Sequence, residues 1–172
     1  NWLMDISKAT TDFVNKYNGE YIDEDKSFGS QCWDVVARFA REVVGCPSFP
    51  TISGGAEGLW RLTAPIINQY FEKVAPTDIK KGDIIVWDRT FFPPWGHTAL
   101  AIEDYNPKTG TVKVLEQNGA DDPNGDGIAD GKAYITTRTL NKVNGGLRAK
   151  EQAVKPTYQE VLDAFNQFDI GV

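Results

Sequence analysis

The sequence predicts an α+β domain in which N-terminal helices pack on an antiparallel β-sheet. Two observations carry this prediction. Residues 32–44 show the apolar spacing of an amphipathic helix, and the chain after residue 80 holds short apolar runs separated by turn residues. Helices followed by a series of antiparallel strands are typical of the α+β class, in which the two kinds of element occupy separate parts of the chain.

Three segments show helical spacing. Residues 6–17 place their apolar side chains on one face. Residues 32–44 repeat apolar side chains at i, i+3, i+4 and i+7, and Gly45 can terminate this helix. Residues 59–71 can form a further short helix that is interrupted at Pro65, because proline lacks the backbone N–H of a helix interior.

The predicted strands follow these helices in the chain. Ile84–Trp87 is an apolar run after a turn and is short enough for a buried strand. Residues 97–104 and 111–118 favour strands and flank residues 105–110, whose Asn-Pro-Lys-Thr-Gly composition marks a hairpin loop. Further strands are expected at the edge of the sheet, at residues 133–140 and 146–148.

The length and composition fit one folded domain with a short tail. The chain has 172 residues, of which 41% are hydrophobic and 24% are charged, as in ordinary folded proteins. We expect a domain over residues 1–150. Residues 151–172 form a tail with helical spacing that either docks on the domain or leads into a further module. The first residue is Asn rather than Met, so we expect a longer parent protein with additional domains.

The charge and the hydropathy argue against two classes of partner. The formal net charge is −6, which disfavours attraction to nucleic acid and to an anionic membrane surface. No stretch approaches the roughly 20 apolar residues of a membrane-spanning helix. We therefore expect neither a nucleic-acid partner nor a membrane partner.

The two cysteines differ in their predicted surroundings. If residues 32–44 are helical, Cys32 and Cys46 lie at opposite ends of a segment about 20 Å long, too far apart for a disulfide. Cys32 would occupy the first helical turn, where backbone N–H groups and the helix dipole stabilise a thiolate. Cys32 is therefore a candidate nucleophile, and the alternative is a buried, unreactive cysteine.

His97 is the only histidine in the chain and the only side chain that can act as a base near neutral pH without a large pKa shift. A catalytic imidazole also needs a group that fixes its orientation. With a hairpin loop at residues 105–110, His97 falls opposite Asn118 and Ala99 falls opposite Glu116, so His97, Glu116 and Asn118 share a face. A register slip by one residue would put His97 and Glu116 on opposite faces. The alternative for Glu116 and Asn118 is a solvated strand end.

Gln31 precedes the candidate nucleophile. Its side chain could donate a hydrogen bond, together with the Cys32 backbone N–H, to the oxyanion of a tetrahedral intermediate, or it could only shape the turn.

Four short motifs occur in an order that resembles a known family. They lie at a helix start, before a strand, at the opening of the next strand and at the end of its partner: Gly29-Ser30-Gln31-Cys32-Trp33-Asp34, Lys81-Gly82-Asp83-Ile84, Gly96-His97 and Glu116-Gln117-Asn118. In this arrangement the chain resembles, over residues 5–150, the CHAP domain. That name stands for the cysteine, histidine-dependent amidohydrolases/peptidases of phage lysins and bacterial wall hydrolases.

The resemblance implies a papain-like CHAP fold and acyl transfer through a thioester-type intermediate. It makes Cys32 the nucleophile, His97 the base, and Glu116 with Asn118 the orienting pair. The implied substrate is an amide of bacterial peptidoglycan, cleaved as by an N-acetylmuramoyl-L-alanine amidase or as by an endopeptidase of the peptide stem or cross-bridge. Specificity would reside in loops at residues 45–60, 88–96 and 119–131. Trp60, Trp87 and Trp95 are candidate groove walls, although an aromatic residue is more often part of the core.

The implied place of action is the bacterial cell wall. A phage-encoded protein would reach it after release at lysis or on the virion, and a secreted protein would reach it from the cell. The net charge of −6 weakens unaided attraction to a negatively charged wall, so another module would supply the targeting.

Two other functions fit part of the pattern. An NlpC/P60-like cysteine peptidase usually has a second histidine or a similar polar group after the base, whereas this chain has one histidine. A non-catalytic, calcium-stabilised structural or wall-binding module of a phage tail would leave Cys32 an unreactive thiol, whereas an enzyme requires a thiolate near neutral pH.

Asp23, Asp25 and Asp34 bracket Cys32, and three neighbouring carboxylates repel one another unless solvent or a cation neutralises them. Hard oxygen ligands of this kind suit Ca²⁺. The segment is similar to the calcium loop of some phage CHAP lysins, which implies ligation by these three side chains and by the carbonyls of Ser27 and Gly29. The alternative is a solvated acidic loop.

A second acidic loop has the spacing of an EF-hand. Five residues stand at positions 1, 3, 5, 7 and 9 of such a loop: Asp122, Asn124, Asp126, Ile128 and Asp130. Ala133 stands where the bidentate Glu of an EF-hand would be, so this weaker candidate for Ca²⁺ is equally well explained as an Asp/Gly turn.

Overall fold

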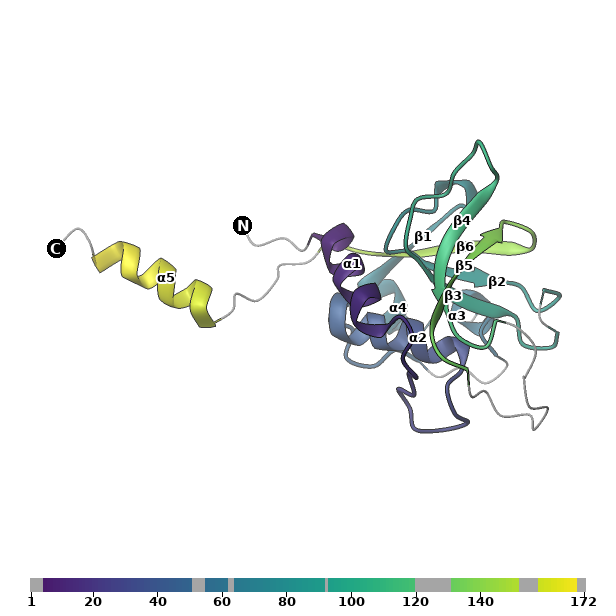
Figure 1. Ribbon diagram of the computed structural model, residues 1–172, viewed down its shortest axis with the longest axis horizontal. Coiled ribbons are helices and arrows are strands. Elements are labelled where there is room, and N and C mark those ends of the chain that lie inside the picture. Colours follow the sequence, from purple (N-terminus) through teal and green to yellow (C-terminus); the bar gives the residue numbers. More distant parts are fainter. Residues whose placement is uncertain are drawn as a thin grey trace.

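A six-stranded antiparallel sheet forms the centre of the molecule. The computed structural model describes residues 5–50, 55–61, 64–91, 93–119, 131–151 and 158–169. The strand order is β1-β6-β2-β3-β4-β5, and the six strands are labelled in Figure 1. The strands are β1 Phe71–Val74, β2 Ile84–Trp87, β3 His97–Ala101, β4 Thr111–Glu116, β5 Tyr134–Thr139 and β6 Val143–Ala149.

The helices precede the sheet in the chain, apart from one in the tail, and confirm the predicted α+β class. They are α1 Ile6–Tyr17, α2 Cys32–Phe39, α3 Gly58–Arg61, α4 Pro65–Tyr70 and α5 Tyr158–Asp169, with a short 3₁₀ turn at Pro76–Asp78. A π-helical turn, Ala40–Val44, continues α2 directly, and Gly45 ends it with a left-handed φ of 79°. The helical segment predicted at residues 32–44 is therefore confirmed, with a wider last turn.

Two apolar layers cover the two faces of the sheet. On one face, residues of α1, α2 and α4 pack against alternate strand residues such as Ile84, Leu100 and Leu115. On the other face, intervening residues such as Ala99 and Val114 form a second cluster with Trp87. The side chains of His97 and Glu116 point to the same face as this second cluster, because successive side chains of a strand point to opposite faces.

The β3–β4 hairpin has the register that its loop length predicted. Leu100 pairs with Leu115 and Ala101 with Val114, which is the pairing that brings His97 and Glu116 to one face. Both strands are shorter than predicted. After Ala101 the chain turns towards Ile79, whose carbonyl accepts the backbone N–H of Tyr105 (3.0 Å).

The placement of the last sheet strand was predicted wrongly. Residues 146–148 were expected at the edge, but β6 lies between β1 and β2, and β1 itself was not predicted. Gly145 and Gly146 hid this central strand because glycine has a low β-propensity. The structure requires glycine at 145, since a Cβ there would lie 2.4 Å from the Val74 carbonyl oxygen. β5 lies at the edge as predicted.

The tail contains the predicted helix, α5. Its apolar residues Val161, Phe165 and Phe168 are exposed, and Figure 1 shows α5 apart from the sheet and its covering helices. The division into residues 1–150 and 151–172 stays a prediction. None of the described helices is long and apolar enough to cross a membrane.

Candidate active site

The N-terminus of α2 presents Cys32. The preceding residue, Gln31, has extended backbone angles (φ −97°, ψ 170°), so Cys32 is the first residue of the helix. Asp34 fixes this helix start, because its carboxylate oxygens accept the backbone N–H groups of Gln31 (2.8 Å) and Glu24 (2.9 Å). The predicted position of Cys32 in the first turn is confirmed. Both cysteines are free thiols, and Cys46 is buried.

His97 opens β3 and lies beside Cys32. Its side chain is 1% exposed, its Nε2 lies 3.1 Å from Glu116 Oε2, and the Cys32 side chain is hydrogen-bonded to the same imidazole. Because Glu116 engages Nε2, Nδ1 is the ring nitrogen that faces the thiol. The structure thus brings His97 and Glu116 together as the hairpin register predicted, and it places Cys32 beside them.

The carboxylate of Glu116 is held by two residues of β5 that the sequence analysis missed. Arg138 donates from Nε to Oε1 (2.8 Å) and from Nη2 to Oε2 (2.6 Å), and the Thr136 hydroxyl donates to Oε1. Glu116 is fully buried. The i, i+2 spacing of Thr136 and Arg138 in a predicted strand was the available signal, because alternate residues of a strand share one face.

Burial and close partners shift the two pKa values in opposite directions. Burial lowers the pKa of His97, but the hydrogen bonds and charges of Cys32 and Glu116 outweigh it and raise this pKa to about 9. Burial raises the pKa of Glu116, but hydrogen bonds from Arg138 and His97 outweigh it and lower that pKa to about 2. The site therefore favours an imidazolium next to a carboxylate at neutral pH.

Asn118 and Gln31 lie near this group, and their predicted roles stay predictions. Asn118 is half-buried two residues beyond Glu116 and has a left-handed φ of 50°, a conformation that asparagine tolerates. Gln31 is half-buried, and its backbone carbonyl accepts hydrogen bonds from the Asp34 N–H (3.1 Å) and from Gln117 Nε2 (3.0 Å).

Gln117 joins the chain before Cys32 to the sheet, a role that the sequence did not predict. It is fully buried, its Oε1 accepts the Ile22 backbone N–H (2.8 Å), and its Nε2 donates to the carbonyls of Ile22 (2.9 Å) and Gln31. The end of β4 thus anchors His97 through Glu116 and the chain before Cys32 through Gln117.

The first acidic loop forms a compact cluster. Oxygen atoms of Asp23, Asp25 and Asp34 all lie within 4.8 Å of one another. Asp23 Oδ1 is buried and has no hydrogen-bond partner among the described residues. Burial and, to a smaller extent, the Asp25 charge raise the pKa of Asp34 to about 6. Hydrogen bonds from backbone N–H groups lower this pKa but do not outweigh burial. The second acidic loop, with Asp122, Asn124, Asp126, Ile128 and Asp130, lies outside the described residues.

The three tryptophans proposed as groove walls have different surroundings. Trp87 is fully buried, so its assignment to a groove wall was wrong. It pairs with His97 in the β2–β3 ladder, and their ring centroids lie 5.3 Å apart. Trp60 is half-buried, with Lys73 Nζ 4.6 Å from its ring centroid. Trp95 is 58% exposed two residues before His97 and keeps its candidacy.

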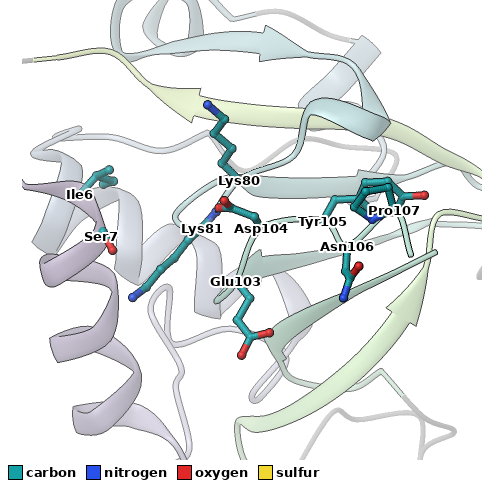
Figure 2. A pocket seen from close by; sticks show the side chains of 9 residues that line it. All are labelled: Ile6, Ser7, Lys80, Lys81, Glu103, Asp104, Tyr105, Asn106 and Pro107. Atoms are coloured by element: carbon teal, nitrogen blue, oxygen red, sulfur yellow. The ribbon is translucent and has the colours of Figure 1, made fainter. Parts of the chain in front are cut away.

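An open hollow of about 740 Å³ lies beyond the other end of β3, between α1 and the turn at residues 103–107 (Figure 2). Three of its charged residues, Lys81, Glu103 and Asp104, already have partners within the chain. The Lys81 backbone N–H donates to Asp104 Oδ1 (2.9 Å), Lys81 Nζ donates to Thr11 (2.6 Å), and Glu103 pairs with Lys113 (3.7 Å). This hollow is separate from Cys32 and His97.

The fold and the site together define a class, a papain-like α+β domain with a cysteine, a histidine and a carboxylate at one end of its sheet. A family model described as the CHAP domain matches residues 21–118, more than half of the chain. The chain therefore belongs to the CHAP-domain family. No curated protein matches it by sequence.

Solved structures show the same fold at low sequence identity. The wild-type endolysin LysIME-EF1 is 22% identical with a TM-score of 0.68, and the match covers 96% of this chain and 85% of that one. The structure of Ly7917 is 11% identical with a TM-score of 0.55, over 85% of this chain and 63% of that one. Ly7917 with the hydrolyzing product of MDP is 13% identical with a TM-score of 0.55, over 83% and 62%.

The two cysteines are predicted to differ in reactivity. Cys32 is partly exposed beside an imidazole, whereas Cys46 is fully buried and burial raises the pKa of its thiol. Iodoacetamide at pH 7 should alkylate Cys32 and spare Cys46, as located by peptide mass spectrometry. The unfolded chain should be labelled at both positions. Equal labelling of both cysteines in the folded chain would contradict the predicted difference in reactivity.

The pKa of His97 predicts how stability depends on pH. Because this pKa is raised from 6.5 to about 9 by folding, its stabilisation is complete below pH 6.5 and is lost as the pH rises through 9. The midpoint of thermal unfolding should fall on the order of 5 °C between these pH values. The raised pKa of Asp34, about 6, changes the stability at lower pH, outside the range in which His97 titrates. His97→Gln should lose most of the fall, and an undiminished fall in that variant would refute the assignment.

Proposed function

We propose that this protein hydrolyses an amide bond of bacterial peptidoglycan, as an N-acetylmuramoyl-L-alanine amidase or as an endopeptidase of the peptide stem or cross-bridge, and that it acts at the cell wall. The observation that carries the proposal is the contact of His97 with Cys32 on one side and with Glu116 on the other. Membership of the CHAP family supports a peptidoglycan hydrolase in general.

The first chemical step forms an acyl-enzyme. The thiol proton of Cys32 resides on His97 Nδ1, as the raised pKa of His97 favours, and the thiolate attacks the carbonyl carbon of the scissile amide. Glu116 stabilises the resulting imidazolium through Nε2. The Cys32 backbone N–H and the Gln31 side chain would donate to the oxyanion. As the C–N bond breaks, His97 passes its proton to the leaving amine and a thioester remains on Cys32.

The second step releases the acid product. Neutral His97 takes a proton from a water molecule, whose oxygen attacks the thioester carbonyl. The C–S bond then breaks, the substrate leaves as a carboxylic acid, and Cys32 and His97 return to their starting state. The paired Glu116 keeps the imidazole in one orientation through both proton transfers, with Asn118 as the second member of the orienting pair.

Calcium is proposed as a structural cofactor of the first acidic loop. The buried, unpartnered Asp23 Oδ1 and the close approach of three carboxylates support a cation there, because buried negative charges need neutralisation. The side chains of Asp23, Asp25 and Asp34 would hold it, with the carbonyls of Ser27 and Gly29. When bound, the ion would neutralise the carboxylate that caps α2 and so brace the segment that presents Cys32.

The hydrolase proposal is tested on purified Gram-positive peptidoglycan. The native chain should reduce turbidity and release new amino groups. Cys32→Ala should lose this activity by at least about a thousandfold, because the thioester cannot form. Cys46→Ala, at the other cysteine, is the matched control and should keep it. The termini exposed in the products identify which amide is cut.

Two results would contradict the hydrolase proposal. An active Cys32→Ala variant would exclude the cysteine mechanism. Inactivity of the native chain on walls from several species, together with an unreactive Cys32, would favour the non-catalytic wall-binding module.

The calcium proposal is tested by thermal unfolding with calcium and with a chelator. Calcium at about 100 times its dissociation constant should stabilise the native chain by about 2.7 kcal/mol, which is several degrees in the unfolding midpoint. Asp34→Asn should abolish this shift. Asp12→Asn, which changes an exposed carboxylate paired with Lys8, should not.

Calorimetric titration gives the stoichiometry of calcium binding. Asp126→Asn tests the second acidic loop, since any binding that disappears in this variant belongs there. A calcium shift that survives in Asp34→Asn and disappears in Asp126→Asn would contradict the first site.

A further inference from the structure

Within the part of the chain that the structure describes, Arg138 makes three hydrogen bonds at the end of β4. Besides its two hydrogen bonds to Glu116, its Nη2 donates to the backbone carbonyl of Gly119 (2.7 Å). Asn118 lies between Glu116 and Gly119 in the sequence. A single guanidinium from β5 therefore fixes both ends of the segment that carries the proposed orienting pair.

Gly119 supports this arrangement independently. A Cβ at this position would lie 1.5 Å from Glu116 Oε2 and 2.7 Å from Arg138 Nη2. No real side chain tolerates such distances. The backbone at Gly119 is therefore pressed directly against the ion pair, which only glycine permits.

Aromatic rings flank the same ion pair. The Arg138 guanidinium lies 5.7 Å from the centroid of the Phe91 ring, and Phe91 stacks on Trp87 with centroids 5.5 Å apart. The Arg138 side chain is 20% exposed and Glu116 is fully buried. The rings limit access of water, so the two hydrogen bonds have little competition.

We propose that Arg138 is a positioning residue of this active site, an inference that rests on the proposed hydrolase function. Its guanidinium holds the Glu116 carboxylate against His97 Nε2 and, through the Gly119 carbonyl, holds Asn118 at the end of β4. Arg138 does not touch the reacting atoms and acts through Glu116. A lysine cannot replace it, because one ammonium cannot match the planar two-point contact with a carboxylate.

Positioning and a simple charge effect predict opposite changes at His97. The charged or titratable groups that the described residues bring to Glu116 are His97 from β3, Arg138 and Tyr134 from β5 and, through the imidazole, Cys32 from α2. If Arg138 supplied only positive charge, its removal would raise the pKa of His97. If it holds the carboxylate, its removal frees Glu116 from Nε2, and burial then lowers the pKa of His97.

NMR of the imidazole ring measures this change directly, because His97 is the only histidine among the 172 residues. In Arg138→Met we expect the pKa of His97 to fall by about one unit or more and the Nε2–H to exchange faster with water. Wall hydrolysis should fall at least about tenfold, with the half-saturating wall concentration within about twofold.

Three further variants separate geometry from charge and from stability. Arg138→Lys keeps the charge and should show a smaller fall in both quantities. Gly119→Ala keeps both charged groups but forces them apart, so the pKa of His97 should again fall. Arg148→Met is the matched control, because Arg148 makes the same three contacts elsewhere, to Asp83 Oδ1 (3.0 Å), Asp83 Oδ2 (2.9 Å) and the Asp78 carbonyl (2.7 Å). It should leave the His97 signals and the hydrolysis rate unchanged.

A raised or unchanged pKa of His97 with a protected Nε2–H in Arg138→Met would overturn the proposal. If that variant does not fold, the same result in Arg138→Lys and Gly119→Ala overturns it. Inactivity of the native chain on walls would refute the proposed function alone, since the NMR comparison still decides whether Arg138 positions Glu116.

Discussion

The fully buried charge of Glu116 is the constraint on which the site depends. A carboxylate removed from water is tolerated only with close partners, and removing one partner of a buried pair costs about 3–5 kcal/mol. Glu116 has three such partners, Arg138, Thr136 and His97. Because they keep it ionised, the neighbouring imidazole is held in its protonated form, and this positive charge lies beside the Cys32 sulfur.

This constraint requires an unambiguous sheet register. His97, Glu116 and Arg138 come from three adjacent strands, and a slip by one residue in either hairpin would turn one of them to the opposite face. Leu100 and Leu115 prevent a slip of the first hairpin, because they pair with each other and lie buried against the helices. The apolar core on one face thus determines the polar contacts on the other.

The sequence predicted the parts of the site that depend on local pattern. Cys32 at a helix start follows from apolar spacing, and the pairing of His97 with Glu116 follows from the length of a six-residue loop. Arg138 could not be placed in this way. The segment between β4 and β5 is too long for loop arithmetic, so the register of β5 was undetermined. β6 was misplaced because Gly145 and Gly146 pack against Val74 and have a low strand propensity. β1 was missed because its first residue, Phe71, was included in the helix predicted at residues 59–71.

The relative positions of Cys32 and His97 are set largely by two consecutive residues. Successive residues of a strand point in opposite directions, so Glu116 reaches His97 while Gln117 reaches the backbone of Ile22 and Gln31. Asp34 then links the same backbone to the first turn of α2. The positions of Cys32 and His97 are therefore both fixed by contacts with the end of β4. The contacts that hold that strand end in place are consequently as important to the site as Cys32 or His97.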